Sequence, residues 1–157
     1  MVILKTYLLE LHNMELNFNI TNLTENDYSL SAEFNGKEIG RLCFEILKNP
    51  FTHAMHEFVR KSILKENLQL TNYIFLHDFY VEPLYRNNKI GTRLLTGVIG
   101  IVELKFPEYK LMLDAHPFSD VTFANDSTLL SVDKLIQFYE KFDFTYIEGF
   151  GNNIMIR

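Results

Sequence analysis

A short polar segment carries two positive charges immediately ahead of an apolar helical pattern. In the stretch RNNKIG, Arg86 and Lys89 precede a helix that the apolar spacing predicts over residues 92–105. The first N–H groups of a helix lack intrahelical partners, and the helix dipole adds partial positive charge there. Such an end either binds an anion such as phosphate or is capped by a nearby side chain, here Asn87 or Asn88. The residues alone leave both interpretations open.

Carboxylates and histidines that could accept a proton stand in two strand-like segments. Asp114 lies in the otherwise apolar run LMLDA, where a buried acid without a partner would be costly. Such groups can remove a proton from an amine, directly or through water. The alternative bases are two acids that share one face of the preceding strand and two histidines, namely Asp78, Glu82, His77 and His116.

Two further features suggest chemistry only weakly. His53 and His56 are spaced i and i+3 on an expected helix and could bind a metal, but no third ligand stands at a helpful spacing, and exposed helix histidines are the commoner case. Cys43 lies between Leu42 and Phe44, and we expect a small buried hydrophobic residue there rather than a catalytic thiol.

The composition is that of one globular domain. The chain has 157 residues, 47% hydrophobic and 22% charged, so we expect residues 1–157 to form a single domain. A net charge of −5 argues against a nucleic-acid partner. No apolar run reaches the ~18 residues of a membrane span, and the N-terminus lacks a signal-peptide pattern, so we expect no membrane partner. A single cysteine allows no intrachain disulfide, which favours the cytoplasm.

The rest of the chain supplies the elements that must position these residues. Asn35 and Gly36 separate two alternating segments within residues 28–46, which predicts a β-hairpin. Apolar spacing of three to four residues predicts helices, and runs of β-branched and aromatic residues predict strands. The predicted helices cover 52–66, 92–105 and 132–142, the predicted strands cover 2–11, 14–20, 73–82 and 109–116 with two more within 144–157, and 117–130 is predicted to be a loop.

The order of these elements indicates the fold class. A strand, a helix and a strand follow one another from residue 73, and such a crossover pairs strands 73–82 and 109–116 in parallel. The strands before and after them are joined by hairpins. We therefore predict an α/β fold with a mixed, mostly antiparallel central sheet, one parallel strand pair, and helices on both faces.

Two segments of the chain resemble the motifs of a known enzyme family. The stretch VEPLYRNNKIGTRLL resembles the acetyl-coenzyme A motif of the GNAT N-acetyltransferases, with matches at Val81, Pro83, Tyr85, Arg86, Gly91, Leu94 and Leu95. The stretch LIQFYEKFDF resembles a second family segment, with matches at Phe138, Tyr139, Glu140, Lys141 and Phe144. The two motifs stand in the expected order with the expected strand between them, and the resemblance covers residues 73–157.

The resemblance implies a bound co-substrate, acetyl-CoA, and no metal. It implies that the two parallel strands splay apart at one end, that the polar loop holds the pyrophosphate, and that a backbone N–H at Tyr80 or Val81 meets the thioester carbonyl. The implied cofactor-binding residues are Tyr80, Val81, Arg86, Asn87, Asn88, Lys89, Ile90, Gly91, Thr92 and Asp133.

The resemblance also implies the reaction, in which a primary amine attacks acetyl-CoA directly. Tyr139 matches the motif tyrosine that would protonate the leaving thiolate. Asp114 lies where a subset of the family, notably members that acetylate protein N-termini, carries a glutamate, and is our candidate base. The implied partners are a small-molecule or peptide amine and, from family habit, a second copy forming a homodimer through the terminal strands.

The chain departs from the family motifs at two glycine positions, which are Lys89 and Asp143 here. A left-handed backbone at Lys89 would cost roughly 1–2 kcal/mol, whereas aspartate tolerates that conformation better than most residues. These departures favour an alternative, a divergent GNAT-like domain that binds CoA or a protein partner without catalysis. The 14 phenylalanines leave a third interpretation open, in which a longer acyl chain is transferred.

Overall fold

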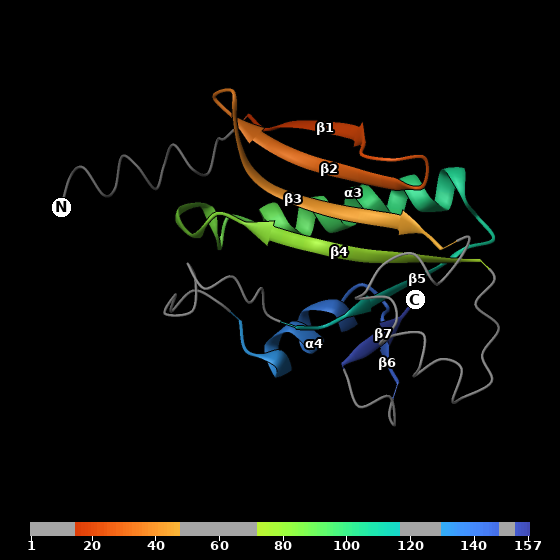
Figure 1. Cartoon of the computed structure of the whole chain (residues 1–157). Helices are drawn as coiled ribbons and strands as arrows, with labels where there is room; N and C mark the ends of the chain where they lie inside the picture. The colour runs from red at the N-terminus through yellow and green to blue at the C-terminus, as the bar shows by residue number, and fades with distance from the viewer. Residues whose placement is uncertain (1–14, 48–71, 117–129, 148–152) are drawn as a thin grey trace.

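The computed structural model describes residues 15–47, 72–116, 130–147 and 153–157, which form a seven-stranded sheet with helices packed against it (Figure 1). The strands are β1 (Asn17–Asn22), β2 (Asp27–Phe34), β3 (Lys37–Ile46), β4 (Tyr73–Val81), β5 (Lys110–Asp114), β6 (Thr145–Tyr146) and β7 (Ile154–Ile156). The helices are α3 (Ile90–Lys105) and α4 (Val132–Glu140), with a 3₁₀ turn, η1 (Pro83–Tyr85), ahead of α3.

The sheet has the predicted mixed topology. The strand order is β1-β2-β3-β4-β5-β7-β6, in which only β4 and β5 pair in parallel. The predicted α/β class and the parallel crossover through α3 are therefore confirmed. The strand predicted at 2–11 and the helix predicted at 52–66 lie outside the described residues, as does nearly all of the loop predicted at 117–130.

The hairpin between β2 and β3 is confirmed at its turn. Asn35 and Gly36 have φ angles of 52° and 75°, the positive values that a tight turn between antiparallel strands requires. Other boundaries differ by a few residues. β1 begins at Asn17 rather than at 14, and α4 ends at Glu140 rather than at 142. The helix ends early because the chain turns through Asp143, whose φ is 65°.

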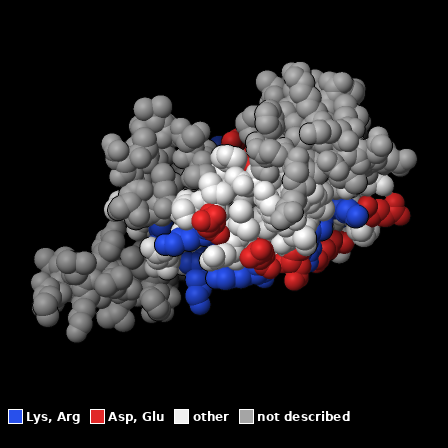
Figure 2. Space-filling view, turned by 90° about the horizontal axis from the view of Figure 1, so that it is seen from below, with Lys and Arg blue, Asp and Glu red and all other residues white. Residues whose placement is uncertain are grey.

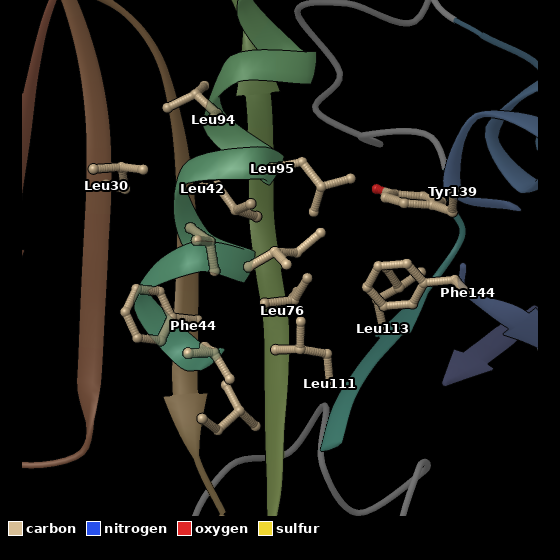
Figure 3. Packing of buried hydrophobic residues seen from close by; sticks show 14 of the residues in the cluster. Leu30, Leu42, Phe44, Leu76, Leu94, Leu95, Leu111, Leu113, Tyr139 and Phe144 are labelled. Carbon is tan, nitrogen blue, oxygen red and sulfur yellow. The ribbon is translucent and has the colours of Figure 1, made fainter. Parts of the chain in front are cut away.

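Helix α3 packs on one face of the sheet and forms the main core with it (Figure 3). Its buried positions recur at helical spacing, and each large apolar side chain buried there stabilises the fold by about 1.5–3 kcal/mol. The contact fixes the start of the helix beside the end of β4. The buried residues of α3 are Ile90, Leu94, Leu95, Val98, Ile99 and Val102. In the described part of the chain, no helix is both long and apolar enough to cross a membrane.

Strand β4 contains a β-bulge at Asp78, whose φ is 46°. The register reveals the extra residue, since Arg41 and Cys43 of β3 pair with Tyr80 and His77 of β4. A bulge inserts one unpaired residue and shifts the alternation of side chains by one position. No prediction from the sequence included this bulge.

The bulge decides which side chains of β4 face α3. Leu76, ahead of the bulge, belongs to the main core. Beyond the bulge, Phe79 and Val81 lie against Gly91 of α3. Because successive residues of a strand point to opposite faces, Tyr80 and Glu82 are directed to the face away from α3.

Candidate active site

The parallel pair β4 and β5 splays apart at one end, as predicted. Their pairing stops at Leu76 and Leu113, although β4 continues to Val81. Glu82 N–H donates to the Ile39 carbonyl of β3 at 2.8 Å, so the preceding residue directs its backbone groups to the opposite side. The N–H of Val81 therefore faces the opening between the strands.

The same alternation separates the two residues that were proposed to meet a thioester carbonyl. Tyr80 pairs with Arg41 and, by this alternation, directs its N–H toward β3. The backbone groups of Tyr80 are engaged in the sheet, whereas the N–H of Val81 faces the opening between β4 and β5. Of the two residues, only Val81 is placed to donate to a ligand there.

The loop after β4 folds back onto the end of the strand. Arg86 Nε donates to the Val81 carbonyl at 2.8 Å. Asn88 Nδ2 donates to the carbonyls of Tyr85 and Arg86 at 3.1 and 3.0 Å. These three hydrogen bonds hold the loop and the Arg86 side chain beside the splay. The capping interpretation is wrong, because the Asn88 side chain bonds backward and does not cap the helix.

The N-terminus of α3 is left uncapped by side chains. Its N-cap is Lys89, which makes no side-chain cap hydrogen bond, and the first turn holds no acid. The first intrahelical bond runs from Arg93 N–H to the Lys89 carbonyl at 2.9 Å. Within the described residues no acceptor meets the N–H groups of residues 90–92. Buried Ile90 can contribute only its backbone to a ligand, whereas Thr92 and Asn87 are exposed. This end suits a phosphate.

Both departures from the family glycines adopt the glycine-like conformation. Lys89 has φ 59° and ψ 15°, and Asp143 has φ 65°. The left-handed backbone that was considered for these two positions is therefore confirmed. Neither substitution has moved the loop away from the conformation that the glycine would supply.

Tyr139 lies in the last turn of α4, with its ring near Phe79 of β4. Its side chain is 7% exposed, and its ring centroid lies 6.3 Å from that of Phe79 and 5.8 Å from that of Phe144. The hydroxyl points toward Leu95 of α3 (Figure 3). Burial, and then the negative charge of Asp114, raise the pKa of Tyr139 above its usual range. The residue is a neutral phenol that can donate a proton.

Asp114 has the partner that an acid at the end of an apolar strand needs. His116 Nδ1 lies 2.6 Å from Asp114 Oδ1, and the two side chains are 54% and 26% exposed. The structure thus joins two separately considered bases into one pair at the end of β5.

The other candidate bases are engaged elsewhere. Glu82 pairs with Lys37 at 2.9 Å, and this hydrogen bond raises the pKa of Lys37. His77 and Asp78 lie 3.3 Å apart across the bulge, on the face of the sheet away from α3. They are not brought together with Tyr139.

Asp133 lies exposed in the first turn of α4, where a carboxylate favours the dipole. The cap itself is Ser131, whose Oγ accepts from Lys134 N–H at 3.4 Å, a residue that the sequence analysis overlooked. Cys43 is buried as expected, and burial raises the pKa of its thiol, which disfavours a nucleophilic thiolate.

Charges of both signs lie along the described surface in Figure 2. Lysine and arginine side chains gather along the lower left of that surface, and acidic side chains are more frequent toward its right.

Comparison with known proteins agrees with the geometry. The profile of the Acetyltransferase (GNAT) family matches residues 3–144. The chain belongs to this family. No curated protein sequence matches the chain.

Solved GNAT structures share the fold. The chain is similar to a GNAT family acetyltransferase from Elizabethkingia anophelis with acetyl-CoA bound, with a TM-score of 0.55 and 14% identity over 90% of this chain and 96% of that one. An acyl-CoA N-acyltransferase from Pseudomonas aeruginosa gives 0.54 and 14% over 86% and 70%. The PaiA N-acetyltransferase of Thermoplasma acidophilum in complex with coenzyme A gives 0.50 and 20% over 84% and 60%. Identities this low show the fold alone.

Two features of this GNAT site were absent from the sequence analysis. Phe79 packs on Tyr139, and the bulge at Asp78 turns Phe79 toward it. The run YIFLHDFYV carries no signal for the bulge, because apolar residues occupy both odd and even positions on each side of His77 and Asp78.

Proposed function

We propose that this GNAT protein is an N-acetyltransferase that moves the acetyl group of acetyl-CoA to a primary amine by direct attack. The observation that carries the proposal is the uncapped N-terminus of α3, with Arg86 and Lys89 beside it, next to the opening where β4 and β5 part. Acetyl-CoA supplies an activated acyl group when bound, and these residues suit its charge and shape.

The loop residues divide the work of binding. The N–H groups of residues 87–92 meet the pyrophosphate, and Arg86 and Lys89 supply formal charge. The N–H of Val81 donates to the thioester carbonyl, where negative charge develops during attack. Asp133, at the start of α4, is a further residue that contacts the coenzyme. Tyr80, which was expected to share the role of Val81, serves instead to pair β4 with β3.

Two side-chain groups move the protons of the transfer. The pair of Asp114 and His116 accepts a proton from the attacking amine, so that the new carbon–nitrogen bond leaves a neutral amide. Tyr139 gives its proton to the sulfur as the carbon–sulfur bond breaks. Its raised pKa means that the phenol is neutral and carries this proton at neutral pH.

The packing supports acetyl rather than a longer acyl group. Aromatic rings around Tyr139 fill the space between β4 and α4, with Phe79 and Phe138 6.2 Å apart and Phe138 and Phe142 5.2 Å apart. The left-handed backbones of Lys89 and Asp143 weaken the case for a non-catalytic domain, since the loop keeps the conformation of the motif. The acceptor is a small-molecule or peptide amine, and we place the reaction in the cytoplasm.

The test is a thermal shift with acetyl-CoA, free CoA and a longer acyl-CoA, followed by a screen of primary amines for CoA release. A ligand at about 100 times its Kd adds roughly 2.7 kcal/mol to the folded state. For a domain of this size that is a rise of about 5–10 °C. We expect the rise with acetyl-CoA, and a smaller rise in the Arg86→Ala variant.

The matched control is Arg41→Ala, which removes an arginine that pairs with Glu38 on the surface at 2.8 Å. This variant should respond to acetyl-CoA like the wild type. No rise at millimolar acetyl-CoA would refute the proposal. A rise without acetyl transfer to any amine would favour the non-catalytic alternative.

A further inference from the structure

A second cluster of reactive side chains lies on the face of the sheet away from α3. Cys43 of β3 and His77 of β4 are register partners, so their side chains share that face. Asp78 joins them, and one donor atom from each of these three residues lies within 4.8 Å of the other two. The donors are a sulfur, an imidazole nitrogen and a carboxylate oxygen.

The β-bulge brings the carboxylate into this cluster. In a regular strand, neighbouring residues point to opposite faces, and Asp78 would be directed away from His77. At the bulge the backbone of Asp78 has φ 46°, an uncommon conformation for a residue with a Cβ. Its Oδ2 consequently lies 3.3 Å from His77 Nδ1. A strained bulge that gathers donor atoms is a motive to look for a ligand.

His77 is oriented by a second acid on the opposite side of its ring. Asp27 Oδ1 of β2 lies 3.1 Å from Nε2, and the two side chains are 16% and 15% exposed. The Phe75 ring lies nearly parallel to the imidazole, with centroids 6.4 Å apart. When Nε2–H donates to Asp27, the lone pair of Nδ1 faces Asp78. A carboxylate bound to the distal nitrogen is the usual way in which proteins orient a metal-binding histidine.

We propose that Cys43, His77 and Asp78 bind a transition-metal cation of the Zn²⁺ type, with Asp27 as a positioning residue. Sulfur, nitrogen and oxygen donors together suit zinc, whereas calcium and magnesium prefer oxygen alone. Binding forms a sulfur–metal bond and releases the thiol proton of Cys43 to solvent. The proposal differs from the expectation of a metal-free protein, which came from family resemblance.

The site has a closed side and an open side. Cys43 is 2% exposed, whereas the side chain of Asp78 is 61% exposed, so a cation enters past the carboxylate. Three protein donors leave the fourth position of a tetrahedral ion free for water or another ligand. None of these residues belongs to the proposed acetyl-CoA site, so the two proposals stand or fall separately.

The experiment titrates metal-free protein with Zn²⁺ by calorimetry and with Co²⁺ by absorbance. We expect one ion per chain and a thiolate-to-cobalt charge-transfer band. Asp27→Ala should weaken binding about 10–100-fold and keep the band, as loss of an orienting acid does at other metal sites. Asp78→Asn should weaken binding further, and Cys43→Ser should abolish the band. Glu33→Gln, which changes another carboxylate on β2, is the control and should bind as the wild type.

The Asp78→Asn variant, at an exposed position, still tests the proposal when the Cys43→Ser variant does not fold. Cys43 is buried and its substitution can unfold the chain, but asparagine tolerates the left-handed backbone of position 78. The proposal is overturned if folded wild-type protein binds no Zn²⁺ at stoichiometric concentration. It is equally overturned by Co²⁺ binding without the thiolate band, or by an Asp78→Asn variant with unchanged affinity. In those cases His77 is simply an ion-pair partner of the two acids.

Discussion

Replacing Lys89 by glycine should make the protein more stable and a poorer binder of acetyl-CoA. The two effects have separate origins at one residue. The backbone of Lys89 is left-handed, with φ 59° and ψ 15°, at the N-cap of α3. Its ammonium stands beside the helix N-terminus that we propose as the pyrophosphate site. Glycine relieves the strain of the left-handed backbone and removes the positive charge of the ammonium.

The stability gain follows from the backbone. The left-handed conformation costs a residue with a Cβ roughly 1–2 kcal/mol in the folded state. Glycine avoids this cost, but its larger backbone freedom stabilises the unfolded chain by about 0.5–1 kcal/mol. The net gain is about 0.5–1 kcal/mol, because Lys89 makes no side-chain cap that would be lost. At about 2–4 °C per kcal/mol for a domain of this size, the melting temperature should rise by about 1–4 °C.

The binding loss follows from the charge. An exposed ion pair contributes at most about 1 kcal/mol, which corresponds to about a fivefold change in Kd. The assay is calorimetric titration with acetyl-CoA at two salt concentrations, paired with thermal unfolding of the ligand-free protein. The loss should shrink at higher salt, because screening weakens the contact between an exposed ammonium and a phosphate.

Two control variants separate the effects. Lys89→Ala removes the charge and keeps the Cβ, so it should weaken binding without raising the melting temperature. Asn35→Gly relieves another left-handed residue, with φ 52°, in the hairpin turn between β2 and β3, and should leave the affinity unchanged. A Lys89→Gly protein that is no more stable would refute the strain argument. Unchanged affinity in both Lys89 variants would remove Lys89 from the phosphate site.

The remaining predictions concern Tyr139 and two glycines. Burial favours the neutral phenol, so the free energy of unfolding should fall as the pH rises above about 10, the usual tyrosine value. In Tyr139→Phe, pH-dependent unfolding should show a smaller fall, together with lower kcat at neutral pH; an identical fall would contradict the buried phenol. Gly40→Ala would place a Cβ 3.0 Å from the Tyr80 carbonyl and should destabilise by about 1–3 kcal/mol. Gly100→Ala meets nothing within 4 Å on α3 and should stabilise by about 1 kcal/mol, with denaturant titration comparing the pair.

Local sequence determined the elements and their turns. The pair Asn35 and Gly36 predicted a tight hairpin, and the chain adopts it with two positive φ angles. Lys89 and Asp143 were expected to take the left-handed conformation from their motif positions, and they do. These features depend on the backbone preferences of a few adjacent residues, which a sequence states directly.

Element ends were predicted less well, because packing selects them. The apolar spacing placed the start of α3 at Thr92, but burial of Ile90 extends the helix back to Lys89 as its cap. Neither Asn87 nor Asn88 caps it, and the Asn88 side chain bonds to the carbonyls of Tyr85 and Arg86 instead. Capping and back-bonding use the same side-chain atoms, and only the fold of the loop chooses between them.

Only the tertiary structure decided which distant groups meet. The sequence offered Asp114 and His116 as separate candidates, and the fold at the end of β5 brings their side chains to 2.6 Å. The register of β3 against β4 sets Cys43 beside His77, and the bulge adds Asp78. Strand register and the crossing of helix and sheet arise from the burial of whole apolar faces, a sum over many residues far apart in the chain. A short sequence pattern does not show how distant apolar faces pack together. The sites that this packing creates can therefore be recognised only in the folded molecule.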